Sequence, residues 1–347
     1  MSAESYIRGL PKAELHVHLE GSMQPETLLK LARLHGVALP ADDVAGLREW
    51  FRFSDFRHFL QIYSAICDSL KERDDFELLT WQLGEELARQ HVRYAEVTYS
   101  VVPHTRRGVP FDQSFAGLCR GRERVRRVLG VEIRWIFDLM HNSSRSDWRD
   151  ACEQTLACAI EGQREGVVAL GLAGDERDGP TATFAPWFER ARAAGLHAVP
   201  HAGELCGPES VWQAIDALGA ERIGHGVRAA EDPALPAVLK ERGIALEVCP
   251  TSNVCLNVCD GYGGHALPAL LAAGVPLSIG SDDPPLFNTT LTDELLLLRA
   301  QFGLDLDTID ELVLNSVRHS FLPAPRRREL EEGFRTEMLA LKAEHLT

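Results

Sequence analysis

Short runs of apolar and β-branched residues alternate along the chain with longer amphipathic stretches of helical period. The helical patterns include residues 113–129, 149–165 and 208–218. Strands that alternate with such helices predict parallel pairing through crossover connections. Eight units of this kind predict the α/β class and a (β/α)₈ TIM barrel. The predicted strands cover residues 13–18, 93–99, 133–139, 167–173, 196–201, 222–225, 244–249 and 275–281.

Two segments go beyond a minimal barrel, a helical insertion after the first strand and an extension after the last. Residues 20–92 form the insertion, and residues 304–347 predict two or three further helices. We expect residues 1–347 to fold as a single barrel domain. An open doubly wound sheet is the alternative fold, but no G-x-G-x-x-G motif follows the first strand to support it.

The insertion carries an aromatic series whose spacing is partly helical. Such a series is typical of a helix packed on a core, and after the first strand it could instead form an apolar lid over the barrel mouth. The series comprises Trp50, Phe51, Phe53, Phe56, Phe59 and Tyr63.

Composition and charge narrow the class of partner. Of 347 residues, 45% are hydrophobic and 25% are charged, which excludes a disordered or fibrous chain. The net charge of −15 argues against nucleic acid as the main partner, because phosphate binding needs a positive field. We interpret the arginine-rich stretches at residues 120–127 and 326–328 as solvated helix faces.

The apolar stretches and the cysteines indicate in which cellular compartment the protein is found. Residues 266–281 are too short and too broken by Pro and Gly to span a bilayer, and residues 1–10 lack the features of a secretory signal. We therefore expect a cytoplasmic protein that makes no membrane contact. The eight cysteines form no C-x-x-C pair and are most simply buried thiols, although Cys249, Cys255 and Cys259 are close enough for a soft-metal site.

Polar residues collect at the carboxyl ends of the predicted strands, where barrels keep their catalytic groups. His16 and His18 are two residues apart and therefore point the same way, into the barrel. In a closed barrel the eighth strand lies beside the first, which brings Asp282 near both histidines. Three imidazoles and one carboxylate suit Zn²⁺ with an open position for water. The candidates are His16, His18, His201, His225 and Asp282 with its neighbour Asp283.

The remaining polar residues of this set suggest hydrolytic chemistry. A divalent ion supplies hydroxide at neutral pH, and hydroxide needs an electrophile that can be protonated. Glu204, three residues after His201, could act as the general acid if partial desolvation raises its pKa, or could merely complement a helix dipole. His225 can hold the attacking water or take its proton. Asp283 remains available to bind a substrate nitrogen.

Six short motifs together make the sequence resemble the adenosine deaminase family of metal-dependent amidohydrolases. The resemblance implies one Zn²⁺ per chain, bound by His16, His18, His201 and Asp282, in a (β/α)₈ barrel. The motifs, in chain order, are PKAELHVHLEGS at 11–22, GLAGDE at 171–176, HAGE at 201–204, RIGHGV at 222–227, CPTSN at 249–253 and SDDPP at 281–285.

The same resemblance implies the reaction, hydrolytic removal of the 6-amino group of an aminopurine. Hydroxide adds to C6 while Glu204 protonates N1, and His225 positions the attacking water. Asp283 bonds N7 and the backbone N–H of Gly174 faces N3. His18 also lies against the substrate. Expulsion of ammonia leaves the 6-oxopurine.

One position departs from the adenosine deaminase pattern. Glu20 stands where adenosine deaminases usually carry Asp, the residue that meets the 5′-hydroxyl of ribose. Members that act on free adenine or on some 5′-modified adenosines also carry Glu there. The sequence after Asp283 lacks the tyrosine-containing stretch common in adenine deaminases. We therefore expect adenosine or a 5′-substituted adenosine, such as methylthioadenosine or aminodeoxyfutalosine, with adenine as the alternative.

Two other functions compete with deamination. Barrel hydrolases that cleave esters or amides often bridge two metals with a carboxylated lysine after the fourth strand, and no lysine falls there. A non-catalytic relative is expected to have lost a ligand or Glu204, and all of these residues are present.

Overall fold

The computed structural model describes residues 2–346 and contains each of the eight predicted strands. Observed and predicted bounds differ by at most two residues at either end. The strands are β1 Lys12–His18, β2 Val92–Tyr99, β3 Glu132–His141, β4 Val167–Gly174, β5 His197–Ala202, β6 Arg222–His225, β7 Ala245–Val248 and β8 Leu277–Ile279.

The strands form one parallel sheet in the order β1 to β8, which closes on itself. The seam is a parallel bridge between Val17 and Asp282, just beyond the end of β8. There the Asp282 N–H donates to the carbonyl of His16, and the His18 N–H donates to the carbonyl of Asp282, both at 2.9 Å. The predicted (β/α)₈ barrel is therefore confirmed, and the open sheet is excluded.

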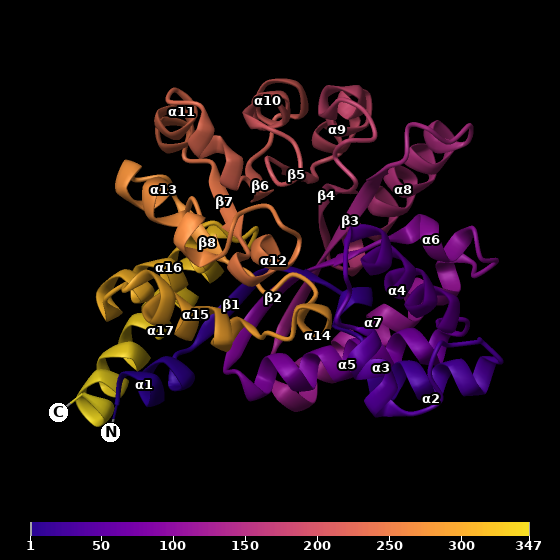
Figure 1. The fold of residues 1–347 in the computed structure, drawn as a ribbon, viewed down its shortest axis with the longest axis horizontal. Coiled ribbons are helices and arrows are strands. Elements are labelled where there is room, and N and C mark those ends of the chain that lie inside the picture. Colours follow the sequence, from indigo (N-terminus) through magenta and orange to yellow (C-terminus); the bar gives the residue numbers. More distant parts are fainter. Residues whose placement is uncertain (1, 347) are drawn as a thin grey trace.

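Helices surround the strands on the outside, and the two termini lie together beside α1 and α17 (Figure 1). No helix among residues 2–346 is both long enough and apolar enough to cross a bilayer. After β1 come η1 Glu20–Ser22, α2 Pro25–His35, α3 Val44–Trp50, α4 Phe56–Ser69 and α5 Arg73–Arg89. The other α-helices are α1 Ala3–Gly9, α6 Val101–Thr105, α7 Phe111–Leu129, α8 Trp148–Gly162, α9 Ala185–Ala193, α10 Pro208–Gln213, α11 Leu235–Arg242, α12 Pro250–Cys255, α13 Leu267–Ala273, α14 Pro284–Phe287, α15 Leu291–Phe302, α16 Leu306–Arg318 and α17 Ala324–His345.

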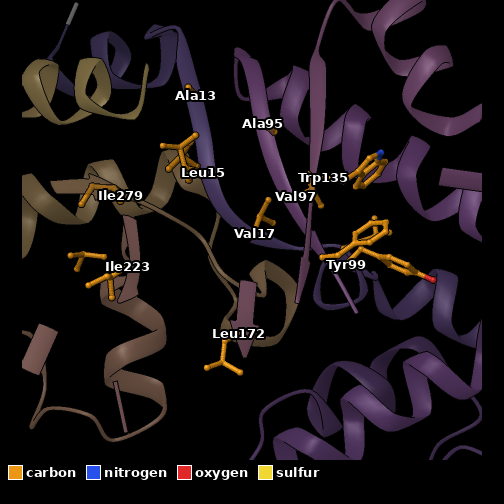
Figure 2. Close-up of a cluster of buried hydrophobic side chains, with 14 of the residues drawn as sticks. Ala13, Leu15, Val17, Ala95, Val97, Tyr99, Trp135, Leu172, Ile223 and Ile279 are labelled. Atoms are coloured by element: carbon orange, nitrogen blue, oxygen red, sulfur yellow. The ribbon is translucent and has the colours of Figure 1, made fainter. Parts of the chain in front are cut away.

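Alternation along β1 sends its side chains to two different environments. Ala13, Leu15 and Val17 belong to the large buried cluster between the sheet and its helices (Figure 2). The intervening positions, His16 and His18 among them, point into the barrel. The site residues of β1 are thus fixed by the burial of their apolar neighbours, because a one-residue slip would exchange the two faces.

The interior of the barrel holds little apolar material. A small cluster of Ile136, Ala169 and Val199 fills part of it, and Phe321 packs against this cluster from the segment after α16. The rest of the interior is largely polar, and this polar interior supports the site at the mouth.

The aromatic series of the insertion lies over the barrel mouth. Phe59 of α4 stacks on Phe287 of α14 with ring centroids 5.8 Å apart, and Phe53 meets the same ring edge-on at 5.7 Å. These contacts join the insertion to the segment that follows β8. The series packs on the core, and because it also lies over the mouth, the lid interpretation stays a prediction.

Candidate metal centre and substrate pocket

Four side chains from three parts of the chain converge at the carboxyl ends of the strands. The Nε2 atom of His18 lies 3.3 Å from Nε2 of His201 and 3.4 Å from Oδ1 of Asp282. That oxygen is 3.7 Å from Nε2 of His16. Atoms that each lie ~2.0–2.1 Å from a tetrahedral Zn²⁺ are ~3.3–3.4 Å apart, so this spacing fits the ion. The donor set, three imidazoles and a carboxylate, fits it as well.

The backbone at the site adopts an unusual conformation. Asp282 and His225 have φ angles of 62° and 58°, in the left-handed region that non-glycine residues rarely occupy. Such conformations persist where the surrounding structure enforces them. For Asp282 the two hydrogen bonds to β1 do so, and they hold its carboxylate against His18 and His16.

A buried chain of charges orients His16. Its Nδ1 atom lies 2.8 Å from Oε2 of Glu247, and Oε1 of Glu247 accepts the Nε–H of Arg222 at 2.6 Å. Arg222 also donates to Oε2 of Glu96 at 2.5 Å and stacks over the Phe321 ring. Because Glu247 accepts the Nδ1 proton, the Nε2 lone pair faces the cluster, where it has no other hydrogen-bond partner.

Cys249 lies in the same cluster as the predicted ligands. One set of potential ligand atoms within 4.8 Å of one another comprises His16, His225, Cys249 and Asp282, and another comprises His16, His18 and His201. Among residues 2–346, no such set includes Cys255 or Cys259. The alternative soft-metal site of three cysteines therefore has no support in the described part of the chain.

Glu204 follows β5 in a turn that a second carboxylate holds in place. Oε2 of Glu176 accepts the backbone N–H of Glu204 at 3.0 Å and those of the two residues that follow. The Glu204 side chain is buried, with Oε1 3.6 Å from Nε2 of His225. Burial, followed by the charges of Asp282 and Glu176, raises its pKa well above the ordinary range. The raised pKa favours the protonated form of Glu204, the form that can donate a proton.

Two residues fix the orientation of His225. Asn253 lies 3.2 Å from Nδ1 of His225 through its amide nitrogen and 3.1 Å from Nε2 of His265 through its amide oxygen. The amide therefore donates to Nδ1 of His225. Burial is the main cause that lowers the pKa of His225 to about 3. A neutral imidazole whose Nδ1 accepts a hydrogen bond carries its proton on Nε2, which faces the cluster.

Asp283 stands directly against the backbone of the first loop. A Cβ atom added at Gly21 would lie 1.5 Å from Oδ1 of Asp283, so only glycine allows this approach. Oδ1 is buried and has no hydrogen-bond partner. Burial, followed by the neighbouring Asp282, raises the pKa of Asp283 well above the ordinary range. The raised pKa favours the protonated form of Asp283, which can donate a hydrogen bond.

A pocket opens beside these groups and extends beneath α4. The cavity has a volume of about 70 Å³, which is smaller than the ~300–1,000 Å³ typical of small-molecule sites. Gly174, with a φ of 95°, lies in its wall at the end of β4. The lining residues are His18, Phe56, Phe59, Leu60, Tyr63, Ser100, Asp138, Met140, Ala173, Gly174, His201, Glu204, His225, Leu256, Asp282 and Asp283.

Glu20 lies just behind this wall. Its side chain is fully buried, and Oε1 accepts the Ser100 N–H at 3.2 Å and faces His104 Nε2 at 2.9 Å. Sequence reasoning missed Ser100 and Asp138, which line the pocket next to it. A signal for Asp138 existed, since it is an acidic residue near the carboxyl end of the third predicted strand. Glu176 ends the GLAGDE motif at residues 171–176, but the sequence alone did not indicate its function.

The relatives of the chain are consistent with this geometry. An aminodeoxyfutalosine deaminase of Streptomyces coelicolor is 40% identical over 334 residues, which cover 96% of this chain and 85% of that protein. An adenine deaminase of Bordetella parapertussis is 38% identical over 312 residues, 90% of this chain and 97% of that protein.

The fold has solved counterparts as well. The crystal structure of an adenine deaminase from Arthrobacter aurescens superposes with a TM-score of 0.88 at 32% identity and covers 94% of this chain and 98% of that one. Residues 11–337 match the family described as adenosine deaminase. That match and the identities to the two deaminases show that the protein belongs to the adenosine deaminase family.

Proposed function

We propose that this protein is a zinc-dependent hydrolase that removes the 6-amino group of adenosine or a 5′-modified adenosine such as aminodeoxyfutalosine. The products are the 6-oxopurine and ammonia. The observation that carries the proposal is that His18 Nε2 lies 3.3 Å from His201 Nε2 and 3.4 Å from Asp282 Oδ1, distances that fit a tetrahedral Zn²⁺, beside the buried Glu204. One Zn²⁺ fits His16, His18, His201 and Asp282, and when bound it would lower the pKa of water enough to supply hydroxide at neutral pH.

The groups around the metal site match the needs of attack at C6. Glu204, protonated in its buried position, donates a proton to ring N1 and makes C6 electrophilic. His225, neutral with its proton on Nε2, holds the attacking water in line and stabilises the charge that develops on it. Glu204, now a carboxylate, takes the proton of the new C6 hydroxyl and passes it to the amino group, so that the C6–N bond breaks, ammonia leaves and the C6=O bond forms.

Two further contacts orient the purine ring. Asp283 in its protonated form donates to N7, and the N–H of Gly174 faces N3. With His18 on the same wall, these contacts leave C6 pointed at the metal site. Reactant alignment of this kind lowers the entropic cost of the chemical step.

The choice of a nucleoside rests on two observations. The identity to the aminodeoxyfutalosine deaminase, 40%, exceeds the 38% to the adenine deaminase. The pocket also continues past the ring-binding groups to α4, where Phe56, Leu60 and Tyr63 line it. We propose that Glu20, which holds Ser100 in the pocket wall, contributes indirectly to binding at the α4 end of the pocket. We also propose that the aromatic residues of α4 act as a lid over the pocket. Deamination of free adenine is the alternative.

A substrate panel tests the proposal. The zinc-loaded protein is assayed for loss of absorbance at the adenine-to-hypoxanthine difference band with adenosine, methylthioadenosine, aminodeoxyfutalosine and adenine. We expect kcat/KM for the nucleosides to exceed that for adenine. A higher value for adenine would replace the nucleoside assignment with the alternative, and turnover of none of the four would refute deamination.

We also propose a cytoplasmic location. Support comes from the eight cysteines, all of which are free thiols in the fold. Proteins that fold in oxidising compartments commonly pair theirs. Neither nucleic acid nor a membrane is proposed as a partner.

A further inference from the structure

Asp138 has the features of an unfilled hydrogen-bonding position in the pocket. Its side chain is 2% exposed and lines the cavity from β3. One carboxylate oxygen, Oδ2, accepts the Ser100 hydroxyl at 3.0 Å. The other, Oδ1, is buried and has no hydrogen-bond partner. Buried polar atoms are nearly always paired, so an unpaired one in a cavity wall indicates a place for a ligand.

The hydroxyls beside Asp138 leave it as the acceptor of the group. The Ser100 hydroxyl donates its hydrogen to Asp138. The Tyr63 hydroxyl lies 3.3 Å from Ser100 Oγ and is therefore the donor in the hydrogen bond between these two hydroxyls. Both hydroxyl hydrogens therefore run toward Asp138. Oδ1 of Asp138 therefore presents an acceptor lone pair to the cavity, and a hydrogen-bond donor would satisfy it.

The charges around Asp138 agree with this need. Glu20 lies behind it, and among residues 2–346 no ion pair includes Asp138. Burial, followed by the charge of Glu20, raises the pKa of Asp138 to about 7. The protein itself thus stabilises the charged form of Asp138 poorly, and a hydrogen-bond donor from a ligand would stabilise it.

The position of Asp138 specifies which part of the substrate it meets. In the proposed orientation Glu204 faces N1, Asp283 faces N7 and Gly174 faces N3. The N9 side is the part of the purine left to point away from the metal site. The polar lining residues that C6 chemistry does not use are Tyr63, Ser100 and Asp138.

We propose that Asp138 is a specificity-determining residue whose Oδ1 accepts a hydrogen bond from a donor on the N9 side of the purine. That donor is a sugar hydroxyl in a nucleoside or the N9–H group in a free base. The inference rests on the proposed function and deepens it, because it states what the substrate must carry opposite its amino group.

Removing the donor and the acceptor in turn tests the inference. Zinc-loaded wild type and Asp138→Asn are assayed with adenosine and its 2′-, 3′- and 5′-deoxy analogues, and with adenine and 9-methyladenine. Asparagine keeps the shape of the side chain. Its oxygen can still accept from Ser100, which turns an NH₂ group toward the ligand's donor.

In the wild type we expect loss of the recognised donor to lower kcat/KM by at least ~10-fold, the scale of a hydrogen bond to a charged group. In Asp138→Asn the same loss should change kcat/KM by less than ~3-fold. Asp138→Ala, which has no polar side chain at this position, should show the same change of less than ~3-fold. This second variant keeps the test possible if Asp138→Asn does not fold. Asp150→Asn, an exposed position on α8, should behave as the wild type.

The outcomes separate the two sources of the donor and the two proposals. If removing a sugar hydroxyl lowers kcat/KM in the wild type but not in the Asp138 variants, Asp138 recognises that hydroxyl. If replacing adenine by 9-methyladenine does so instead, Asp138 recognises the N9–H group. If removing the donor leaves kcat/KM of the wild type unchanged, or lowers it by the same factor in the wild type and in the Asp138 variants, the role of Asp138 is overturned. The proposal of deamination is unaffected by that result. A wild type that deaminates none of these compounds overturns both.

Discussion

One carboxylate oxygen of Glu176 accepts the backbone N–H of Glu204, at 3.0 Å, together with the N–H groups of the two residues after it. An anion among three converging N–H groups is strongly held, and it fixes the turn in return. The acid that is proposed to protonate the substrate therefore owes its position to a second acid that never touches the substrate.

Glu176→Gln should lower kcat by at least ~10-fold, because a neutral amide holds the turn more weakly and Glu204 loses its alignment. The metal content should stay the same, since no proposed ligand is altered. Steady-state kinetics and elemental analysis check both points. Glu189→Gln, at an exposed position of α9, is the control. Unchanged kcat would show that the turn keeps its shape without this anion.

Glu204→Gln should retain the fold and the metal but lower kcat by at least ~100-fold, the usual scale of general acid catalysis. The substitution keeps the volume of the buried side chain and removes only its transferable proton. Circular dichroism and elemental analysis establish that the variant is intact before kcat is measured. Turnover close to that of the wild type would assign the proton to another group.

Asp282→Ala should lose metal, because its Oδ1 atom lies 3.4 Å and 3.7 Å from the two β1 imidazoles and is the anionic member of the set. Zinc per chain, measured after dialysis, should fall well below one. Asp150→Ala at the surface provides the comparison. Stoichiometric zinc in Asp282→Ala would contradict the proposed ligand set.

Arg222→Met should destabilise the barrel by ~3–5 kcal/mol, because it leaves the buried carboxylates Glu96 and Glu247 without their shared cation. Urea denaturation measures this loss, and Arg127→Met at an exposed position of α7 is the matched control. Since Glu247 orients His16, the affinity for Zn²⁺ measured by chelator competition should fall by ~10–100-fold. A stable variant with wild-type affinity would show that the charges rearrange freely.

The stability of the wild type should depend on pH through Asp138. Burial and the charge of Glu20 raise the pKa of Asp138 from 3.8 to about 7 in the folded protein. Between about pH 4 and 7 the folded state keeps a proton that the unfolded state has released, so stability falls as pH rises through this window.

The size of this effect follows from about 1.4 kcal/mol per pKa unit, which gives up to ~4 kcal/mol across the window. Asp138→Asn removes the titrating group, so its stability relative to the wild type should rise by ~3 kcal/mol between pH 4.5 and 7.5, because part of the change already occurs below pH 4.5. Urea denaturation of both proteins at the two pH values measures the difference. An equal gap at both pH values would mean that Asp138 titrates normally.

Local patterns in the sequence were sufficient to predict the frame of the protein. Apolar runs of strand length and amphipathic helical stretches place the eight strands to within two residues, because each pattern depends on neighbours a few positions apart. The two-residue period turns His16 and His18 together into the barrel. Closure of a (β/α)₈ barrel, a rule of topology, then brings Asp282 beside them.

The supporting contacts depend on which side chains meet across strands that are distant in sequence. Glu247 reaches His16, Ser100 reaches Asp138, and Glu176 reaches the turn of Glu204 only because the strands are staggered by particular amounts. No local period encodes that stagger, which is set by the closing of the whole sheet. The sequence by itself thus determined the strands and the set of reactive groups, and only the tertiary structure decided how those groups are oriented, charged and enclosed.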